Sequence, residues 1–361
     1  MNHRQKNQVA FEKSGKNIEV GAANLCPMDP VILAATNEAS DYVIQTFQSG
    51  LTAEVYRLCI EGKDYTLKKR RPKSGVSNID GQYSFLNEVQ RRQDFYRLKQ
   101  DEQIGKEFDC IVDTVYANYQ LGIILSPWIE GEQITDVTPP LIEQLFSTLI
   151  ACEKAGLMEW DLCSGNMLVD NMGKLTLFDF GYMYPVSPCT EFNSNGLSDP
   201  IFHMVERFET RFYFGWLLTN SVSKSRQLDN YRIVKQLGVK AFENKIRWLV
   251  EQNADNVVIN HFERIVNKWR EALISTEELG KLFRLESFRS HVLDIEDDLH
   301  GKSCTSTTAM RVEYVLHCLE EDYDELLQQG GFFYQNSNKS KDELIQSYKE
   351  KQVLVARYQS K

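Results

Sequence analysis

The chain has 361 residues, of which 42% are hydrophobic and 25% are charged, and its formal net charge is −10. A chain of this length buries a large core and is expected to divide into two domains or lobes. The acidic balance argues against nucleic-acid or anionic-membrane binding by the surface as a whole. No stretch approaches the roughly 18 apolar residues of a membrane-spanning helix, and the N-terminus is too polar for a secretory signal, so we expect a cytoplasmic protein that does not bind membranes.

The first part of the chain shows strand patterns around one helix. Residues 1–40 form a tail without clear periodicity. Residues 41–131 then contain β-branched and aromatic runs separated by turn signals, with one run of helical spacing after an NIDG turn. The strands are expected at Asp41–Phe47, Ala53–Ile60, Asp64–Arg70, Cys110–Tyr119 and Leu121–Ile129, and the helix at Ser84–Leu98.

The second part of the chain, residues 132–361, is predicted to be mainly helical. A helix is expected to begin at the prolines Pro139 and Pro140 and to stop at Gly156. Long amphipathic stretches follow a polar loop, and they are Phe202–Leu218, Tyr231–Gln252, Val257–Leu273 and Thr307–Gln329. The pattern predicts an α+β protein with a small antiparallel lobe, a mainly helical lobe and a helical C-terminal extension.

Cysteine usage bears on metal binding. The eight cysteines are widely scattered and form no CxxC pair, so we expect free thiols. Four residues could be assembled into a zinc site, but their spacing fits no standard ligand pattern and we do not expect one. They are His300, Cys304, His317 and Cys318.

The clearest motif lies between residues 159 and 182, where the chain reads EWDLCSGNMLVDNMGKLTLFDFGY. Asp161 and Asn166 stand in a D-x-x-x-x-N spacing, and Asp179 begins a DFG triplet after an apolar hairpin. Phosphoryl transfer from ATP needs oxygen ligands for magnesium and a carboxylate beside the attacking hydroxyl. The spacing therefore predicts that Asp179 and Asn166 bind Mg²⁺, and that Asp161 orients or deprotonates the acceptor hydroxyl.

A lysine for the ATP phosphates is expected on the third predicted strand, where the basic run KKRRPK begins. The YTLK order favours Lys68, and Glu88 on the following helix is then its ion-pair partner. Lys69 is the alternative, and the two lysines face opposite sides because side chains alternate along a strand.

Two weaker signals complete a nucleotide site. The turn FQSGLTAEVY offers Gly50 in place of a three-glycine phosphate loop, with Ala53 and Val55 at its last positions. The adenine is expected against the segment SPWIEG, where backbone groups between Ser126 and Ile129 could bond its edge. Each signal alone indicates no more than a turn.

These motifs resemble those of the protein-kinase-like superfamily, in its atypical branches. The run WDLCSGNMLVDNMGKLTLFDFG is similar to the HGDLHPGNVLV…LIDFG block of aminoglycoside and choline phosphotransferases. The runs SGLTAEVYRL and LKKRRPK resemble the N-lobe of RIO kinases and of the small kinase in the tRNA threonylcarbamoyladenosine machinery. The resemblance covers about residues 47–182 and implies a two-lobed kinase-like fold with ATP and Mg²⁺ as cofactors.

The chain also departs from that family. Glu159 and Trp160 replace the His and Arg or Gly that precede the catalytic Asp, so activation by loop phosphorylation is not expected. No convincing A-P-E segment follows, since PIFHMVERFE offers only Glu206. The usual platform for protein substrates is therefore in doubt, and small-molecule acceptors gain weight.

The sequence predicts a Mg·ATP-dependent phosphotransferase that moves the γ-phosphoryl group to a hydroxyl, with protein Ser or Thr slightly favoured over a small molecule. One alternative is a pseudokinase that binds partners through its C-terminal helices. Another is a kinase-fold nucleotidyltransferase, because metal ligands serve either orientation of ATP. A nucleic-acid-linked kinase depends on KKRRPK, and the acidic total counts against it unless a partner presents the RNA.

Overall fold

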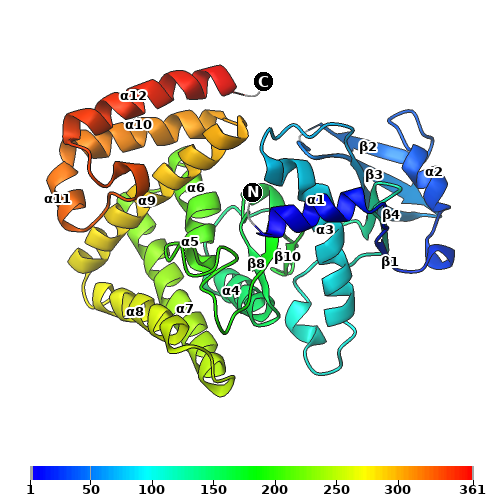
Figure 1. Ribbon diagram of the computed structural model, residues 1–361, viewed down its shortest axis with the longest axis horizontal. Helices are drawn as coiled ribbons and strands as arrows, with labels where there is room; N and C mark the ends of the chain where they lie inside the picture. The colour runs from blue at the N-terminus through cyan, green and yellow to red at the C-terminus, as the bar shows by residue number, and fades with distance from the viewer. Residues whose placement is uncertain (1–2, 49, 360–361) are drawn as a thin grey trace. The chain divides into compact units, whose positions relative to one another are not determined.

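The computed structural model describes residues 3–48 and 50–359 and shows the expected α+β class, with a small antiparallel sheet and many helices (Figure 1). The chain divides into two compact units. Unit 1 consists of Met1–Thr135, Glu159–Asp161 and Gly165–Tyr184. Unit 2 consists of Asp136–Met158, Leu162–Ser164 and Pro185–Lys361.

A six-stranded antiparallel sheet forms the frame of unit 1, with the order β1-β5-β6-β4-β3-β2. Its strands are β1 (Glu19–Val20), β2 (Val43–Phe47), β3 (Ala53–Ile60), β4 (Lys63–Arg70), β5 (Tyr116–Asn118) and β6 (Ile123–Pro127). Strand β4 lies between β3 and β6, and its Lys68 is opposite Val55 on one side and Ile124 on the other. Residues that are opposite each other share a face, so the sheet places these three side chains together.

Helix α3 (Ile79–Leu98) packs on this sheet and begins earlier than the sequence pattern indicates. Asn78 caps it, since its side chain accepts a hydrogen bond from the Gly81 N–H at 2.7 Å. The apolar face of the helix buries Phe85, Leu86 and Val89 against the sheet. Packing of this face fixes which residues of α3 can reach strand β4.

The first forty residues, for which the sequence shows no clear periodicity, also belong to unit 1. They contain α1 (His3–Lys13), the edge strand β1, η1 (Ala23–Leu25) and α2 (Pro30–Ala35). Helix α1 lies beside α3 (Figure 1), and Leu33 of α2 joins the core on the sheet. These elements are short, so their periodicity in the sequence is too weak to predict them.

The segment that carries the DFG motif belongs to unit 1, although the sequence placed it with the helical lobe. Strands β7 (Glu132–Gln133), β9 (Met167–Val169) and β10 (Leu175–Leu177) form a three-stranded antiparallel sheet. The hairpin turns at Gly173, whose φ of 79° suits glycine. The remaining short elements near this segment are β8 (Leu157–Glu159), η3 (Ser164–Asn166) and β11 (Met183–Pro185), and η2 (Gly105–Phe108) lies between α3 and β5.

Unit 2 is helical, as the sequence predicts. Its helices are α4 (Pro139–Lys154), α5 (Met204–Phe208), α6 (Phe214–Thr219), α7 (Lys224–Glu251), α8 (Asn256–Ala272), α9 (Thr276–Gly301), α10 (Ser306–Glu321), α11 (Tyr323–Gln328) and α12 (Lys341–Tyr358). A π-helical turn, η4 (Glu209–Tyr213), and a short 3₁₀ turn, η5 (Tyr334–Asn336), complete it. The sequence pattern did not indicate α9 or α12.

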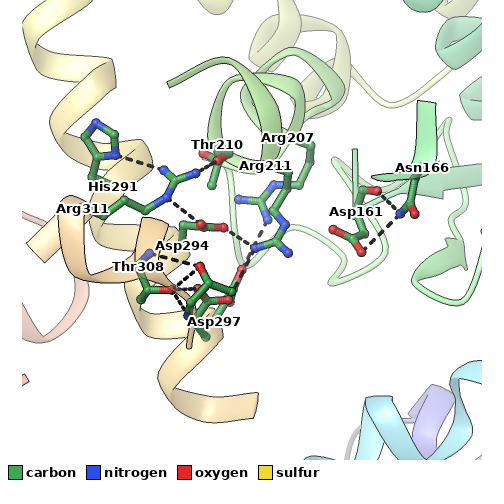
Figure 2. Close-up of polar contacts among 12 residues, drawn as sticks. Asp161, Asn166, Arg207, Thr210, Arg211, His291, Asp294, Asp297, Thr308 and Arg311 are labelled. Atoms are coloured by element: carbon green, nitrogen blue, oxygen red, sulfur yellow. Dashed lines mark hydrogen bonds and ion pairs between the residues drawn. The ribbon is translucent and has the colours of Figure 1, made fainter. Parts of the chain in front are cut away.

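Buried ion pairs join the helices of unit 2. Asp294 of α9 accepts hydrogen bonds from Arg211 of η4 and lies 2.8 Å from Arg311 of α10 (Figure 2). Lys235 of α7 is fully buried and pairs with Glu209 and Glu286. These charges are neutralised within unit 2, because each buried cation has a carboxylate in contact.

None of the helices within residues 3–48 and 50–359 combines the length and the apolar composition that a membrane crossing requires. None of the eight cysteines, all within the described residues, is placed in a disulfide. Among the same residues, no group of three or more His, Cys, Asp or Glu side chains is arranged to hold a metal ion.

Candidate active site

Lys68 and Glu88 form a buried ion pair at the centre of unit 1. The Lys68 ammonium donates to both Glu88 carboxylate oxygens, at 3.1 and 3.0 Å. Strand β4 presents the lysine and helix α3 presents the glutamate, so the pair joins the sheet to its helix. Lys69 points to the other side of the strand and donates to the Thr36 carbonyl oxygen. The structure therefore pairs Glu88 with Lys68 and not with Lys69.

The same ammonium also contacts the carboxylate of the DFG triplet. Lys68 Nζ lies 2.8 Å from Asp179 Oδ2. Burial opposes the charge of Lys68, but the carboxylates of Asp179 and Glu88 outweigh it and hold the pKa of Lys68 above its usual value. Burial likewise opposes ionisation of Asp179, yet the lysine charge keeps the pKa of Asp179 below its usual value. Both groups are therefore charged at neutral pH.

The backbone of the DFG segment is held by helix α3. Asp179 has a φ of 68°, in the left-handed region that non-glycine residues adopt at a cost. The Asn87 side-chain amide donates to the carbonyl oxygens of Phe180 at 3.2 Å, Gly181 at 3.0 Å and Met183 at 2.7 Å. These bonds fix the turn that follows Asp179, and no sequence signal pointed to Asn87.

Asp161 and Asn166 are brought together by the loop between β8 and β9. The Asn166 amide nitrogen donates to the Asp161 carbonyl oxygen at 2.9 Å and lies 3.4 Å from the Asp161 carboxylate (Figure 2). With its nitrogen engaged on Asp161, the amide oxygen of Asn166 is the atom that remains suited to a cation. Asp161 and Asn166 thus form one polar group, in the spacing that the sequence indicates.

Glu159 holds the backbone in front of Asp161. One of its carboxylate oxygens accepts the N–H groups of Trp160 and Asp161, both at 2.8 Å. Burial raises the pKa of Glu159 to about 8, since these two N–H bonds compensate only in part and the charges of Asp161 and Asp179 add to the shift. The sequence shows a glutamate where the resembling motifs have a histidine, but it does not show this role for the glutamate.

The turn between β2 and β3 contains the one glycine that the sequence singled out. A Cβ at Gly50 would lie 2.2 Å from the Ala53 carbonyl oxygen, so only glycine fits. Arg71 donates to the Gly50 carbonyl oxygen at 2.9 Å and anchors the turn. Ala53 and Val55 follow on β3, on the sheet face that carries Lys68. Ser49 in this turn lies outside the described residues.

The expected adenine segment begins in strand β6 and continues beyond its end. Ser126 is buried in β6 and Ile129 lies just after the strand. Between them, the Trp128 ring stacks on Phe47 at a centroid distance of 6.0 Å, with Arg57 over it at 4.2 Å. The Ser126 hydroxyl accepts a hydrogen bond from Arg92 of α3 at 3.2 Å. The sequence missed Arg92, although its spacing of four residues from Glu88 on one helix was a signal.

The donors present fit magnesium. Asp179 and Asn166 offer one carboxylate and one amide oxygen, and the Phe178 N–H donates to the Asn166 carbonyl oxygen at 3.1 Å, which joins the two segments that carry them. Mg²⁺ is typically bound through one or two carboxylates together with substrate phosphates and water, without a full protein cage. The residues therefore suit a magnesium ion that arrives with a nucleotide.

No protein-family model matches the chain, and no curated protein matches it significantly. Among solved structures, one similar chain is WbdD, in its co-crystal structure with the kinase inhibitor LY294002. That match has a TM-score of 0.35 and a sequence identity of 15%, and covers 57% of this chain. It spans 45% of the WbdD chain, less than half of that protein's length.

Proposed function

We propose that the protein is a Mg·ATP-dependent phosphotransferase of atypical protein-kinase-like fold, which transfers the γ-phosphoryl group of ATP to a hydroxyl. One observation carries the proposal: Lys68 Nζ contacts Glu88 and also lies 2.8 Å from Asp179. A lysine that is held by a helix glutamate and reaches the carboxylate of a DFG triplet is suited to bind phosphates beside a metal ligand.

The remaining residues then have distinct roles. Lys68 binds the phosphates, Asp179 and Asn166 hold the metal, and Asp161 orients or deprotonates the acceptor hydroxyl. A magnesium ion held by Asp179 and Asn166 would supply positive charge to the transferring phosphoryl group. Glu159 supports Asp161 through its backbone N–H. Protein Ser or Thr is slightly favoured as the acceptor over a small molecule, on the resemblance of the N-lobe runs.

A purely binding role is disfavoured by the same ion pair. Lys68 and Glu88 are 8% and 3% exposed. Burying two charges gives little or no stability over apolar side chains of the same volume, so a scaffold has no need of them. Nucleotidyl transfer uses the same metal ligands and is distinguished by the fate of the label in the experiment below.

The test is a paired incubation of the protein and its Asp179→Asn variant with Mg²⁺ and either γ-labelled or α-labelled ATP. Cell lysate supplies the acceptors, and label is counted separately in the protein and small-molecule fractions. We expect transfer from γ-labelled ATP only, with a loss of about 100-fold or more in the variant. The fraction that carries the label identifies the acceptor class.

Two results would contradict this function. Transfer from α-labelled ATP would mean nucleotidyl transfer. No transfer of either label, from a protein that still binds candidate partners, would favour a pseudokinase.

A further inference from the structure

Arg92 is a buried cation that the roles above do not use. Its side chain is almost fully enclosed, with the residue 2% exposed. One terminal nitrogen donates to Glu88 Oε1 at 3.1 Å, and the other to the Ser126 hydroxyl at 3.2 Å. The guanidinium carbon also lies 5.2 Å from the centre of the Phe180 ring. Arg92 of helix α3 therefore contacts Glu88 of the same helix, Ser126 of strand β6 and Phe180 of the DFG triplet.

These contacts extend the ion pair into a row of four alternating charges. Arg92 contacts Glu88, Glu88 contacts Lys68, and Lys68 contacts Asp179. Glu88 Oε1 is shared, since it accepts from Lys68 and from Arg92 at the same distance of 3.1 Å. A carboxylate that is neutralised by two cations holds each of them less tightly than it would hold one alone. The attraction between Glu88 and Lys68 is accordingly weaker, and the Lys68 ammonium interacts more readily with other anions.

The stability of unit 1 does not explain the arginine. Helix α3 already packs on the sheet through apolar side chains such as Phe85, Leu86 and Val89. Burying a guanidinium costs more free energy than burying an apolar side chain of similar length, so an apolar residue would serve stability at least as well. The charge of Arg92 lies beside Glu88, where it competes with Lys68, and this effect on Glu88 is what an apolar residue would not supply.

We propose that Arg92 is a positioning residue for nucleotide phosphates: it fixes Glu88 against strand β6 and shares its charge, so that Lys68 remains available to the phosphates. This inference rests on the proposed function. It predicts that Arg92 supports binding of the phosphate groups and leaves binding of the adenosine part nearly unchanged.

The experiment compares the affinities of the full-length protein for Mg·ATP and for adenosine, by calorimetry. Arg92→Met keeps an unbranched stem of similar helix propensity and removes the guanidinium and its charge. We expect it to weaken Mg·ATP binding by about 10- to 100-fold, the range seen when a partner that orients a ligating side chain is removed. Adenosine binding should change by less than about threefold.

Two further variants complete the test. Arg97→Met makes the same change at an exposed position of the same helix, and should bind both ligands as the wild type does. Arg92→Lys restores the charge without the fork that reaches both Glu88 and Ser126, so it should recover part of the Mg·ATP affinity but remain about threefold or more below wild type. This variant also carries the test if Arg92→Met does not fold.

The outcomes separate the inference from the function on which it rests. Wild-type affinity for Mg·ATP in the Arg92 variants would overturn the positioning role alone. Equal losses of Mg·ATP and adenosine binding would also overturn it, because they would mean that Arg92 only supports the fold. A wild-type protein that does not bind Mg·ATP would overturn the proposed function and this inference together.

Discussion

Glu159 is a residue at the site whose protonation differs from that of an ordinary glutamate, because burial raises its pKa to about 8. A glutamate in the unfolded chain titrates near roughly 4.3. Between these two values the native protein holds a proton that the unfolded chain has released. The free energy of unfolding must therefore fall as the pH rises from about 5 to 8, since the unfolded state binds fewer protons over that range.

We expect Glu159→Gln, which has the shape of the neutral acid, to remove this part of the pH dependence. Between pH 5 and 8 the wild type should lose on the order of 2–4 kcal/mol more stability than the variant, as measured by urea unfolding at several pH values. Glu107→Gln, at an exposed position of η2, is the matched control and should follow the wild type. Parallel curves for wild type and Glu159→Gln would contradict a raised pKa.

Lys68 and Lys69 show what strand alternation can and cannot predict about single residues. Strand alternation predicts that they face opposite sides, and they do. It does not say which side carries α3, because that depends on apolar packing between elements distant in the sequence. Asn87 was missed for a related reason, since its three acceptors are backbone carbonyl oxygens and these leave no mark in the sequence.

The two lysines are expected to respond differently to the same substitution. Lys68→Met leaves Glu88 and Asp179 without their shared cation, so it should cost about 3–5 kcal/mol in the free energy of unfolding and abolish Mg·ATP binding. Lys69→Met removes one hydrogen bond to a carbonyl and should cost about 0.5–3 kcal/mol, with nucleotide binding kept. Chemical unfolding and calorimetry measure both quantities. Nucleotide binding that is lost in Lys69→Met and kept in Lys68→Met would reverse the assignment.

At the scale of elements, the sequence predicted best where periodicity and turn signals coincide. Strand β3 has the predicted bounds, Ala53–Ile60, because its run of apolar and β-branched residues is bounded by a turn signal at each end. Helix α12 was missed because its residues are largely polar and its apolar stripe is weak. Its start did carry a signal, the capping box of Ser340 and Glu343. Strand β5 is shorter than predicted, with three residues, because only part of the apolar run Cys110–Tyr119 pairs with its neighbours.

The turn between β2 and β3 offers a test of the phosphate loop. Gly50→Ala should displace the turn, because the new Cβ would lie 2.2 Å from the Ala53 carbonyl oxygen. We expect Mg·ATP affinity to fall by about tenfold or more, equal to about 1.4 kcal/mol. Gly280→Ala in helix α9 is the control: its Cβ would meet only Arg284 at 3.8 Å, so it should add about 0.5–1 kcal/mol of stability and leave binding unchanged. Unchanged affinity in Gly50→Ala would remove the turn from the nucleotide site.

At the scale of the whole molecule, composition and periodicity were enough for the α+β class and for a helical second half. They were not enough for the grouping of the chain, because residues 165–184 join unit 1 through pairing of β9 with β7. Such pairing depends on two short strands that carry almost no pattern of their own. The candidate residues Asp161, Asn166 and Asp179 could still be proposed from the sequence, since they are marked by identity and spacing and need no correct boundary.

Charge distribution over the molecule bears on the alternative of a nucleic-acid-linked enzyme. The run KKRRPK is the strongest basic segment in the sequence, but its side chains are largely engaged within unit 1. Lys68 pairs with Glu88, Arg70 lies 4.8 Å from the centre of the Tyr119 ring, and Arg71 bonds the Gly50 carbonyl oxygen. Lys73 remains as an exposed cation of the run, on a chain of net charge −10.

We therefore expect the protein alone to bind a labelled single-stranded RNA no more tightly than about 100 μM at physiological salt, the weak end of non-specific binding. Filter binding or fluorescence anisotropy measures this, with Lys73→Glu as the companion variant. Nucleic-acid affinity grows with the number of phosphates that cations neutralise, so the two exposed cations of this run, Arg70 and Lys73, supply little of it on a chain of net charge −10. Micromolar binding that weakens with added salt and in Lys73→Glu would instead show a basic surface around this run, and the acceptor search would then have to include RNA-bound substrates.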